Sequence, residues 1–185
     1  MVLYIHGFAS SGKATKAKLT FKYFHNKYKV LTPSLSVEPY RAFQELEKFV
    51  QKYRALNIIG SSLGGFYALL LSGKYNLKAV LINPALSPHL QLKEYTGVNT
   101  NYSTGEKFYW KKSYLSQLKV LKQKYFYLYK PENIILLLST DDNLIDYRKT
   151  MKTLTSDTIV IVNNSGHEFS RYNEVLPLVE KIFRK

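Results

Sequence analysis

The chain has 185 residues, 45% of them hydrophobic, which suits one domain with a substantial core. It contains no cysteine, which excludes disulfides, thiolate catalysis and cysteine-based metal sites. The formal net charge of +14 would attract anionic partners, but only five of the 27 basic residues are arginines, the side chain best suited to phosphate and base recognition. We therefore expect a solvated basic surface without a nucleic-acid partner.

The first residues, VLYIHG, show neither the basic start nor the apolar stretch of a signal peptide. No run approaches the roughly 18 apolar residues that a membrane span needs. We therefore expect a cytoplasmic protein without a transmembrane segment.

Six short apolar segments, rich in β-branched residues, are separated by helical patterns or turn residues. They predict strands at residues 2–6, 29–32, 56–60, 79–83, 134–139 and 158–162. Near-continuous hydrophobicity is typical of parallel strands that are buried on both faces. The sequence therefore predicts a single α/β domain over residues 1–185, with a mostly parallel six-stranded sheet flanked by helices.

Apolar residues at helical spacing predict helices that pack on this sheet by one face. One helix is expected at residues 40–53, another includes residues 66–71, and a third covers residues 172–183. Pro177 lies inside the third segment and predicts a bend or a later helix start there.

The interval from about 84 to 131 shows no clear strand and contains many aromatic residues. So long a connection in a compact domain is usually a lid, a binding loop or a small subdomain. We take Tyr95 and Trp110 as candidate substrate-binding residues of this insertion. The alternative is that its aromatic side chains only cover an edge of the sheet.

The third predicted strand runs into GSSLGGFYALLL, in which Gly60, Ser62 and Gly64 form a GxSxG motif. A strand in front and a helix behind are the context of a nucleophile elbow, where a serine sits on a sharp turn. Small neighbours allow that turn to close. Ser62 is the candidate nucleophile, and a glycine-rich turn without reactivity is the alternative.

A serine nucleophile needs a base, and only His89 and His167 follow Ser62 in the chain. His167 lies in NNSGHEF, directly after the last predicted strand, where the carboxyl edge of the sheet is expected. His89 lies in the insertion. We therefore favour His167 as the base.

The acid that orients the base should follow the fifth predicted strand, in LLLSTDDNLIDY. Asp142 is our choice because it precedes an apolar pair in the turn, whereas Asp146 starts or lies within the next helix. Asp157 begins a strand at the opposite edge. Asp141 stays an alternative on spacing, and helix capping or turn formation is the other role open to this pair.

The segment IHGFASSGKAT has two interpretations. From Gly7 to Lys13 it approaches a phosphate-binding GxxxxGK[ST] loop, but position 14 is alanine where serine or threonine would hold magnesium. As HGF at the end of a strand, it supplies an oxyanion-hole N–H. Only the second interpretation also uses the serine and histidine motifs, so we expect the N–H groups of Phe8 and Leu63 to form the oxyanion hole. Lys13 would then lie in the first turns of a helix capped by Ser10 or Ser11.

With these motifs, the sequence resembles the small bacterial YqiA/YcfP-type esterases of the α/β-hydrolase superfamily. The segments that carry the resemblance are YIHGFASS, GSSLGGFYA, INPAL, EYTG, YSTGE, DDNLIDY and GHEF, so it extends over nearly the whole chain, insertion included. The resemblance implies hydrolysis of short-chain carboxylic esters by Ser62, Asp142 and His167. One departure is Asp141, where glycine is expected.

The resemblance also implies a reduced fold without the first two strands of the superfamily. The six strands would then follow the order 4-3-5-6-7-8 in the superfamily numbering, which is 2-1-3-4-5-6 along this chain.

The resulting hypothesis is a serine hydrolase that needs no cofactor or metal and acts on a small-molecule acyl ester. A thioesterase that acts on an anionic acyl carrier is the nearest alternative, because it would give the positive surface a purpose. A nucleotide-binding protein and a non-catalytic hydrolase-fold binding module are the alternatives from other classes.

Overall fold

The computed structural model describes residues 1–53 and 56–184, and its centre is a six-stranded parallel sheet. The strands are β1 (Val2–Ile5), β2 (Val30–Leu31), β3 (Asn57–Ser61), β4 (Ala79–Ile82), β7 (Ile134–Ser139) and β8 (Thr158–Val162). They are ordered β2-β1-β3-β4-β7-β8, and each pair of neighbours is parallel. The six predicted strands and their order are thereby confirmed.

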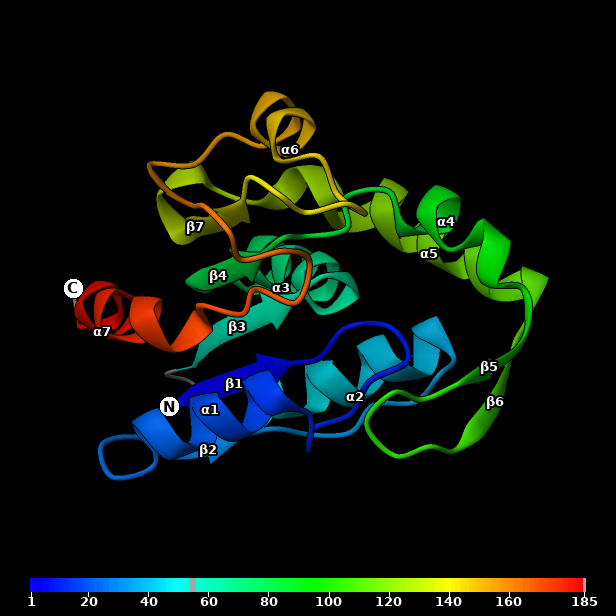
Figure 1. Ribbon diagram of the computed structural model, residues 1–185, viewed down its shortest axis with the longest axis horizontal. Coiled ribbons are helices and arrows are strands. Elements are labelled where there is room, and N and C mark those ends of the chain that lie inside the picture. Colours follow the sequence, from blue (N-terminus) through cyan, green and yellow to red (C-terminus); the bar gives the residue numbers. More distant parts are fainter. Residues whose placement is uncertain (54–55, 185) are drawn as a thin grey trace.

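Helices cover both faces of the sheet (Figure 1). On one face, α1 (Thr15–Phe24) and α7 (Tyr172–Phe183) enclose one core. On the other, α2 (Pro39–Lys52), α3 (Leu63–Tyr75) and α5 (Lys112–Tyr125) enclose a second. A short helix, α6 (Tyr147–Thr153), links β7 to β8. The central strands β1, β3, β4 and β7 are almost fully buried because both faces are covered, as their continuous hydrophobicity predicts.

The insertion contains a β-hairpin, which corrects our expectation that it lacks strands. Strands β5 (Gly97–Thr100) and β6 (Lys107–Trp110) pair antiparallel in a separate two-stranded sheet. Each is four residues long and only Trp110 is buried, so the apolar signal is too weak to predict a strand. Helix α4 (Pro88–Gln91) and three 3-10 turns complete the region, at Lys93–Tyr95, Phe126–Leu128 and Pro131–Asn133.

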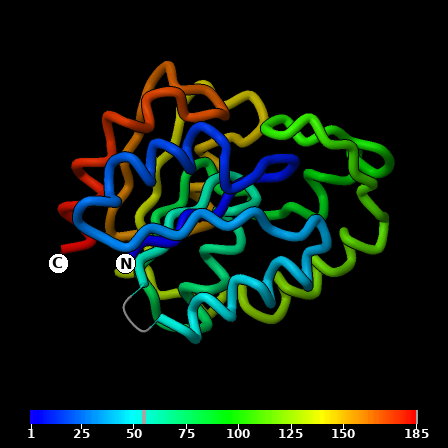
Figure 2. Tube along the Cα trace, turned by 90° about the horizontal axis from the view of Figure 1, so that it is seen from below, coloured from blue at the N-terminus to red at the C-terminus, as the bar shows by residue number. Residues whose placement is uncertain are grey.

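The hairpin lies at one end of the molecule, away from both chain termini, as Figures 1 and 2 show. No helix among the described residues is long and apolar enough to span a membrane.

Two expectations about helix ends also need correction. Helix α1 begins at Thr15, so Lys13 precedes it, and its N-cap is Ala14, without a side-chain cap. Ser11 instead accepts a hydrogen bond from Lys13 N–H within the preceding turn. Helix α7 begins at Tyr172 and continues through Pro177, so the expected later start at the proline is wrong.

Candidate active site

Ser62 lies on a sharp turn between β3 and α3. Its φ of 54° and ψ of −118° are unusual for a residue with a side chain. A Cβ on Gly60 would lie 2.2 Å from Gly64 O, and one on Gly64 would lie 2.1 Å from Ile5 O. Both positions therefore need glycine for this turn to pack against the sheet.

Backbone hydrogen bonds hold the strained conformation of Ser62. Its N–H donates to Ile82 O (2.9 Å), and its carbonyl accepts from the N–H groups of Gly65, Phe66 and Ala85. The turn is thus tied both to the first turn of α3 and to the end of β4. Strain at one residue persists when the surroundings determine its geometry in this way.

The loop after β1 lies against the serine. A Cβ on Gly7 would lie 3.3 Å from the Cβ of Ser62, so the two backbones approach closely. Phe8 follows in this loop, and Leu63 begins α3 directly after Ser62. The two predicted oxyanion residues are thus the chain neighbours of Gly7 and Ser62, which approach each other closely.

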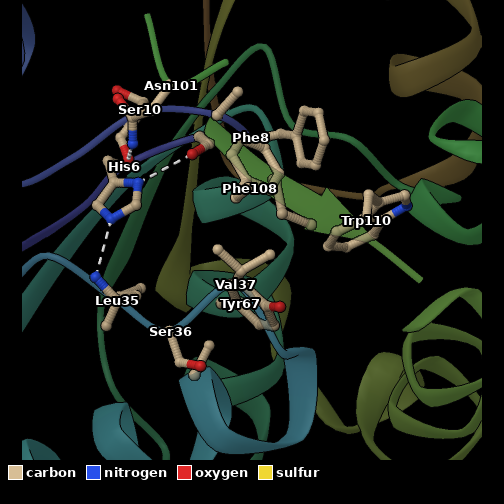
Figure 3. Close-up of a pocket in the computed structure, with 14 residues that line it drawn as sticks. His6, Phe8, Ser10, Leu35, Ser36, Val37, Tyr67, Asn101, Phe108 and Trp110 are labelled. Carbon is tan, nitrogen blue, oxygen red and sulfur yellow. Dashed lines mark hydrogen bonds between the residues drawn. The ribbon is translucent and has the colours of Figure 1, made fainter. Parts of the chain in front are cut away.

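His6 fastens this loop through both ring nitrogens (Figure 3). Its Nε2 accepts from Leu35 N–H (3.1 Å), so its Nδ1 carries the proton and donates to Gly7 O (2.9 Å). The ring is buried, and this burial lowers its pKa. His6 is therefore held neutral, as a structural group of the loop.

The backbone amides of the Gly12 region are already used within the protein. Gly12 N–H donates to Ser34 Oγ, Lys13 N–H to Ser11 Oγ and Ala14 N–H to Ser11 O. A phosphate-binding loop needs such amides to point at the ligand. This geometry does not fit the nucleotide-binding interpretation.

His167 and Asp142 are adjacent at the carboxyl edge of the sheet. His167 Nδ1 lies 2.8 Å from Asp142 Oδ2, and the side chains are 18% and 0% exposed, respectively. The other oxygen of Asp142 accepts from Leu144 N–H and Ile145 N–H, both at 2.8 Å. The carboxylate is thus oriented by its own turn toward the imidazole. Within the described residues, no hydrogen bond joins Ser62 Oγ to His167.

Asp141 makes a different set of contacts. One of its oxygens accepts from Ser139 Oγ (2.7 Å) and Ser165 N–H (2.9 Å), and the other from Gly166 N–H (3.2 Å). The hydroxyl of Ser139 and these two amides lower the pKa of Asp141 to about 2. Asp141 therefore contacts the backbone before His167, whereas Asp142 contacts the ring.

Asn83 was not among the residues singled out from the sequence. Its Oδ1 accepts from Ser139 N–H (2.9 Å), while its Nδ2 donates to Gly166 O (3.0 Å) and His167 O (3.3 Å). The only sequence signal is a polar residue directly after a buried strand, within INPAL. Asp146, by contrast, caps α6 as expected, by accepting from Arg148 N–H.

The other candidate base, His89, lies on α4 in the insertion. Its Nδ1 is buried without a hydrogen-bond partner among the described residues. Burial lowers the pKa of His89, and the nearby Lys122 and Lys119 lower it further. Among the described residues, no hydrogen bond or ion pair links His89 to the carboxylates after β7.

A cavity of about 60 Å³ adjoins the loop after β1. Phe8 and Leu63 both line it, and much of the remaining wall is apolar or aromatic (Figure 3): Leu35, Val37, Ala42, Tyr67, Phe108 and Trp110. Phe8 packs edge-on against Phe108 and Trp110, with ring centroids 5.6 and 4.9 Å apart. The candidate Trp110 is thus in the wall of this cavity. The other candidate, Tyr95, contacts Phe8 with ring centroids 5.3 Å apart but does not line the cavity.

The turn of the hairpin also binds this loop. Tyr102 N–H donates to Ala9 O (2.8 Å) and Asn101 Nδ2 to Ser10 O (2.9 Å). Ser103 Oγ donates to Ser11 Oγ (2.7 Å). The insertion is therefore docked on the loop after β1 by polar contacts at its turn and aromatic contacts along β6.

Comparison with known sequences gives one family, described as "Uncharacterised protein family (UPF0227)", which matches residues 1–183. The chain belongs to this family. A UPF0227 protein from Shewanella woodyi is 34% identical over 94 residues. That match covers 48% of this chain and 52% of the relative, so it spans about half of the relative's length.

Solved structures with similar folds are α/β hydrolases. Mouse alpha/beta hydrolase domain-containing protein 10 has a TM-score of 0.70 at 13% identity, covering 98% of this chain and 90% of the other. Est1E from Butyrivibrio proteoclasticus has a TM-score of 0.68 at 14% identity, covering 100% and 88%. Paleococcus ferrophilus monoacylglycerol lipase has a TM-score of 0.68 at 12% identity, covering 99% and 93%. The chain therefore has the α/β-hydrolase fold, in agreement with the resemblance seen in the sequence.

Proposed function

We propose that this protein is a serine esterase that hydrolyses short-chain carboxylic esters through an acyl-Ser62 intermediate. The observation that carries the proposal is the 2.8 Å contact between His167 Nδ1 and Asp142 Oδ2, at the sheet edge where Ser62 occupies its strained turn. A serine hydroxyl becomes a nucleophile when an oriented base takes its proton.

In the proposed mechanism, His167 Nε2 takes the proton of Ser62 Oγ as the oxygen attacks the ester carbonyl. Asp142 holds the imidazole in the tautomer with the proton on Nδ1 and stabilises the imidazolium. The N–H groups of Phe8 and Leu63 stabilise the oxyanion. His167 then protonates the leaving alcohol. In the second half of the reaction, His167 takes a proton from water, which attacks the acyl carbonyl, and returns that proton to Ser62 Oγ as the acid leaves.

We assign the acyl group to the cavity beside Phe8 and Leu63. Its volume of about 60 Å³ favours a short apolar acyl chain. The hairpin docked on the loop after β1 then forms a wall of the site. Trp110 faces the acyl group in this wall, and Tyr95 supports Phe8 from outside the cavity. Among the proteins of similar fold, the Paleococcus ferrophilus protein is a monoacylglycerol lipase, and Est1E has been solved with bound ferulic acid.

The charge of the molecule supports a second candidate, a thioesterase for an anionic acyl carrier. The net charge is +14, and α5 carries the exposed residues Lys112, Lys119 and Lys124. Turnover of a neutral p-nitrophenyl ester and of an acyl-coenzyme A should be compared at low and high salt. Salt screens steering of the charged substrate, so a selective loss of acyl-coenzyme A turnover would favour the thioesterase.

The primary test is labelling with a fluorophosphonate, followed by mass spectrometry of the modified peptide. We expect modification at Ser62, which should disappear in Ser62→Ala and be strongly reduced in His167→Ala. Ser61→Ala is the matched control, since this neighbouring side chain is buried in β3. Absence of labelling in folded wild-type protein would refute the proposal in favour of a non-catalytic binding module. Labelling at another serine would refute Ser62 as the nucleophile.

A further inference from the structure

We propose that Asn83 and Asp141 are positioning residues that together clamp the loop carrying His167. This loop, residues 163–168, is called the histidine loop below. The inference rests on the proposed function, because it concerns the alignment of His167 with Asp142.

Asn83 reaches the histidine loop from the end of β4. Its side chain is buried and bridges two elements, since Oδ1 accepts from Ser139 N–H at the end of β7 while Nδ2 donates to Gly166 O and His167 O. Its φ of 41° is left-handed, a conformation that asparagine tolerates better than most residues. The carbonyl side of the histidine loop is thereby fixed to the centre of the sheet.

Asp141 binds N–H groups of the same loop, whereas Asn83 binds its carbonyl groups. Its carboxylate accepts from the N–H groups of Ser165 and Gly166. Gly166 is therefore held at its N–H by Asp141 and at its carbonyl by Asn83. Two hydrogen bonds from different strand ends thus fix the peptide groups on either side of Gly166, immediately before His167.

The turn after β7 consequently positions His167 through two neighbouring carboxylates. Asp142 holds the imidazole ring, and its neighbour Asp141 holds the backbone that carries the ring. Because an error of about 1 Å in a catalytic group can cost 100-fold in rate, fixing the loop matters for turnover and not only for stability. This assignment gives the two adjacent aspartates, equivalent by sequence spacing, separate tasks.

The test uses Asn83→Gly, Asp141→Asn and the double variant. Asn83→Gly removes the side chain but keeps a residue suited to left-handed backbone. Its matched control is Asn76→Gly, at another left-handed asparagine (φ 53°) that ends α3 on the exposed surface. The control for Asp141→Asn is Asp146→Asn, at the cap of α6.

Three quantities are measured: kcat and KM for p-nitrophenyl acetate, active sites by fluorophosphonate titration, and amide hydrogen exchange. Each single variant should lower kcat per titrated site about 10- to 100-fold with KM within about twofold. Exchange at Ser165 and Gly166 should accelerate while exchange in β3 and β4 stays unchanged. Because both residues hold one loop, the double variant should lose less than the product of the single effects.

An unchanged kcat in both single variants, with an active wild type, would overturn this inference and leave the proposed function standing. The inference would also be overturned if activity fell only in proportion to the number of titratable sites, or if exchange accelerated throughout the protein. Either result would indicate a purely structural role. A folded wild type that neither hydrolyses the ester nor reacts with the fluorophosphonate refutes the proposed function, and this inference with it.

Discussion

The two loops that carry the proposed base and the proposed oxyanion hole are held in different ways. The histidine loop is fixed by short polar side chains from the ends of β4 and β7, which belong to the central sheet. The loop after β1, called the oxyanion loop here (residues 6–11), is fixed largely by the insertion, through Tyr102 N–H, Asn101 and the ring contacts of Phe8. The proposed base is therefore anchored to the central sheet, whereas the loop of the proposed oxyanion hole is held largely by a peripheral segment.

This difference separates two kinds of sequence change. Changes in the insertion should alter substrate selection and oxyanion geometry while the His167–Asp142 pair stays intact. Changes after β4 and β7 should act on the base and leave the acyl cavity unaltered. The following predictions test this separation, in order of decreasing expected effect.

The largest effect is expected at Asp142, the carboxylate that contacts the imidazole. Asp142→Asn should lower kcat about 10⁴-fold, because an amide no longer stabilises the imidazolium or the required tautomer. Steady-state kinetics with p-nitrophenyl acetate measures the loss. Asp141→Asn should cost much less, about 10- to 100-fold. Equal effects at the two positions would contradict the assignment of the acid.

A smaller effect on rate, but a change in selectivity, is expected at the wall of the acyl cavity. Phe108→Ala enlarges the cavity, so the ratio of kcat/KM for a hexanoate ester to that for an acetate ester should rise about 10-fold. Tyr109→Ala is the matched control, because Tyr109 is the next residue of β6 and is exposed. A similar ratio in both variants would show that the acyl chain binds elsewhere.

The two loops should also differ in their response to pH. Burial lowers the pKa of His6, so the unfolded chain binds more protons than the folded protein once the pH falls below about 6.5, and stability declines there. Urea unfolding at pH 7.5 and 5.5 should show this decline, and His6→Gln should reduce it. A decline of the same size in His6→Gln would assign it to other groups.

The histidine loop should keep its anchor over that range. The pKa of Asp141 is lowered to about 2, so its stabilising contribution, present above its ordinary pKa, is lost only as the pH falls toward 2. Exchange at Ser165 and Gly166, corrected for its intrinsic pH dependence, should therefore report the same protection at pH 5.5 and 7.5. Loss of protection at pH 5.5 would show that Asp141 does not hold these amides.

The smallest effect is expected at the turn of the hairpin. Asn101→Ala removes the hydrogen bond to Ser10 O and also those that Asn101 Oδ1 accepts from Ser103 and Thr104 within the turn. Only the first of these joins the oxyanion loop, so kcat/KM should fall by only a few-fold, in line with about 1 kcal/mol for one partly exposed hydrogen bond. Exchange in the histidine loop should be unchanged, as measured by hydrogen exchange with mass spectrometry. Acceleration there would mean that the two loops are coupled.

The sequence predicted well what depends on local pattern. The six core strands are apolar runs with clear ends, and the Gly60–Ser62–Gly64 turn has a motif of its own. Strands β5 and β6 escaped prediction because they are short and largely exposed, with only one buried side chain.

The roles of Asn83 and Asp141 escaped prediction for another reason. Their partners lie in the histidine loop, 83 and 24 positions away for Asn83–Gly166 and Asp141–Ser165, and no sequence spacing encodes such contacts. Ser11 does not cap α1, because its hydroxyl accepts a hydrogen bond from Lys13 N–H in the turn before the helix. Local capping rules do not include this competition.

The position of β8 at the edge of the sheet has a consequence for how the protein becomes active. From β1, the chain adds β3, β4, β7 and β8 outward in succession, and the histidine loop follows the last of them. An intermediate with β1 to β4 in place contains the serine turn and the oxyanion loop but lacks the base. The proposed ester cleavage should therefore recover during refolding only when the sheet is complete, and its recovery should lag behind the return of helical circular dichroism.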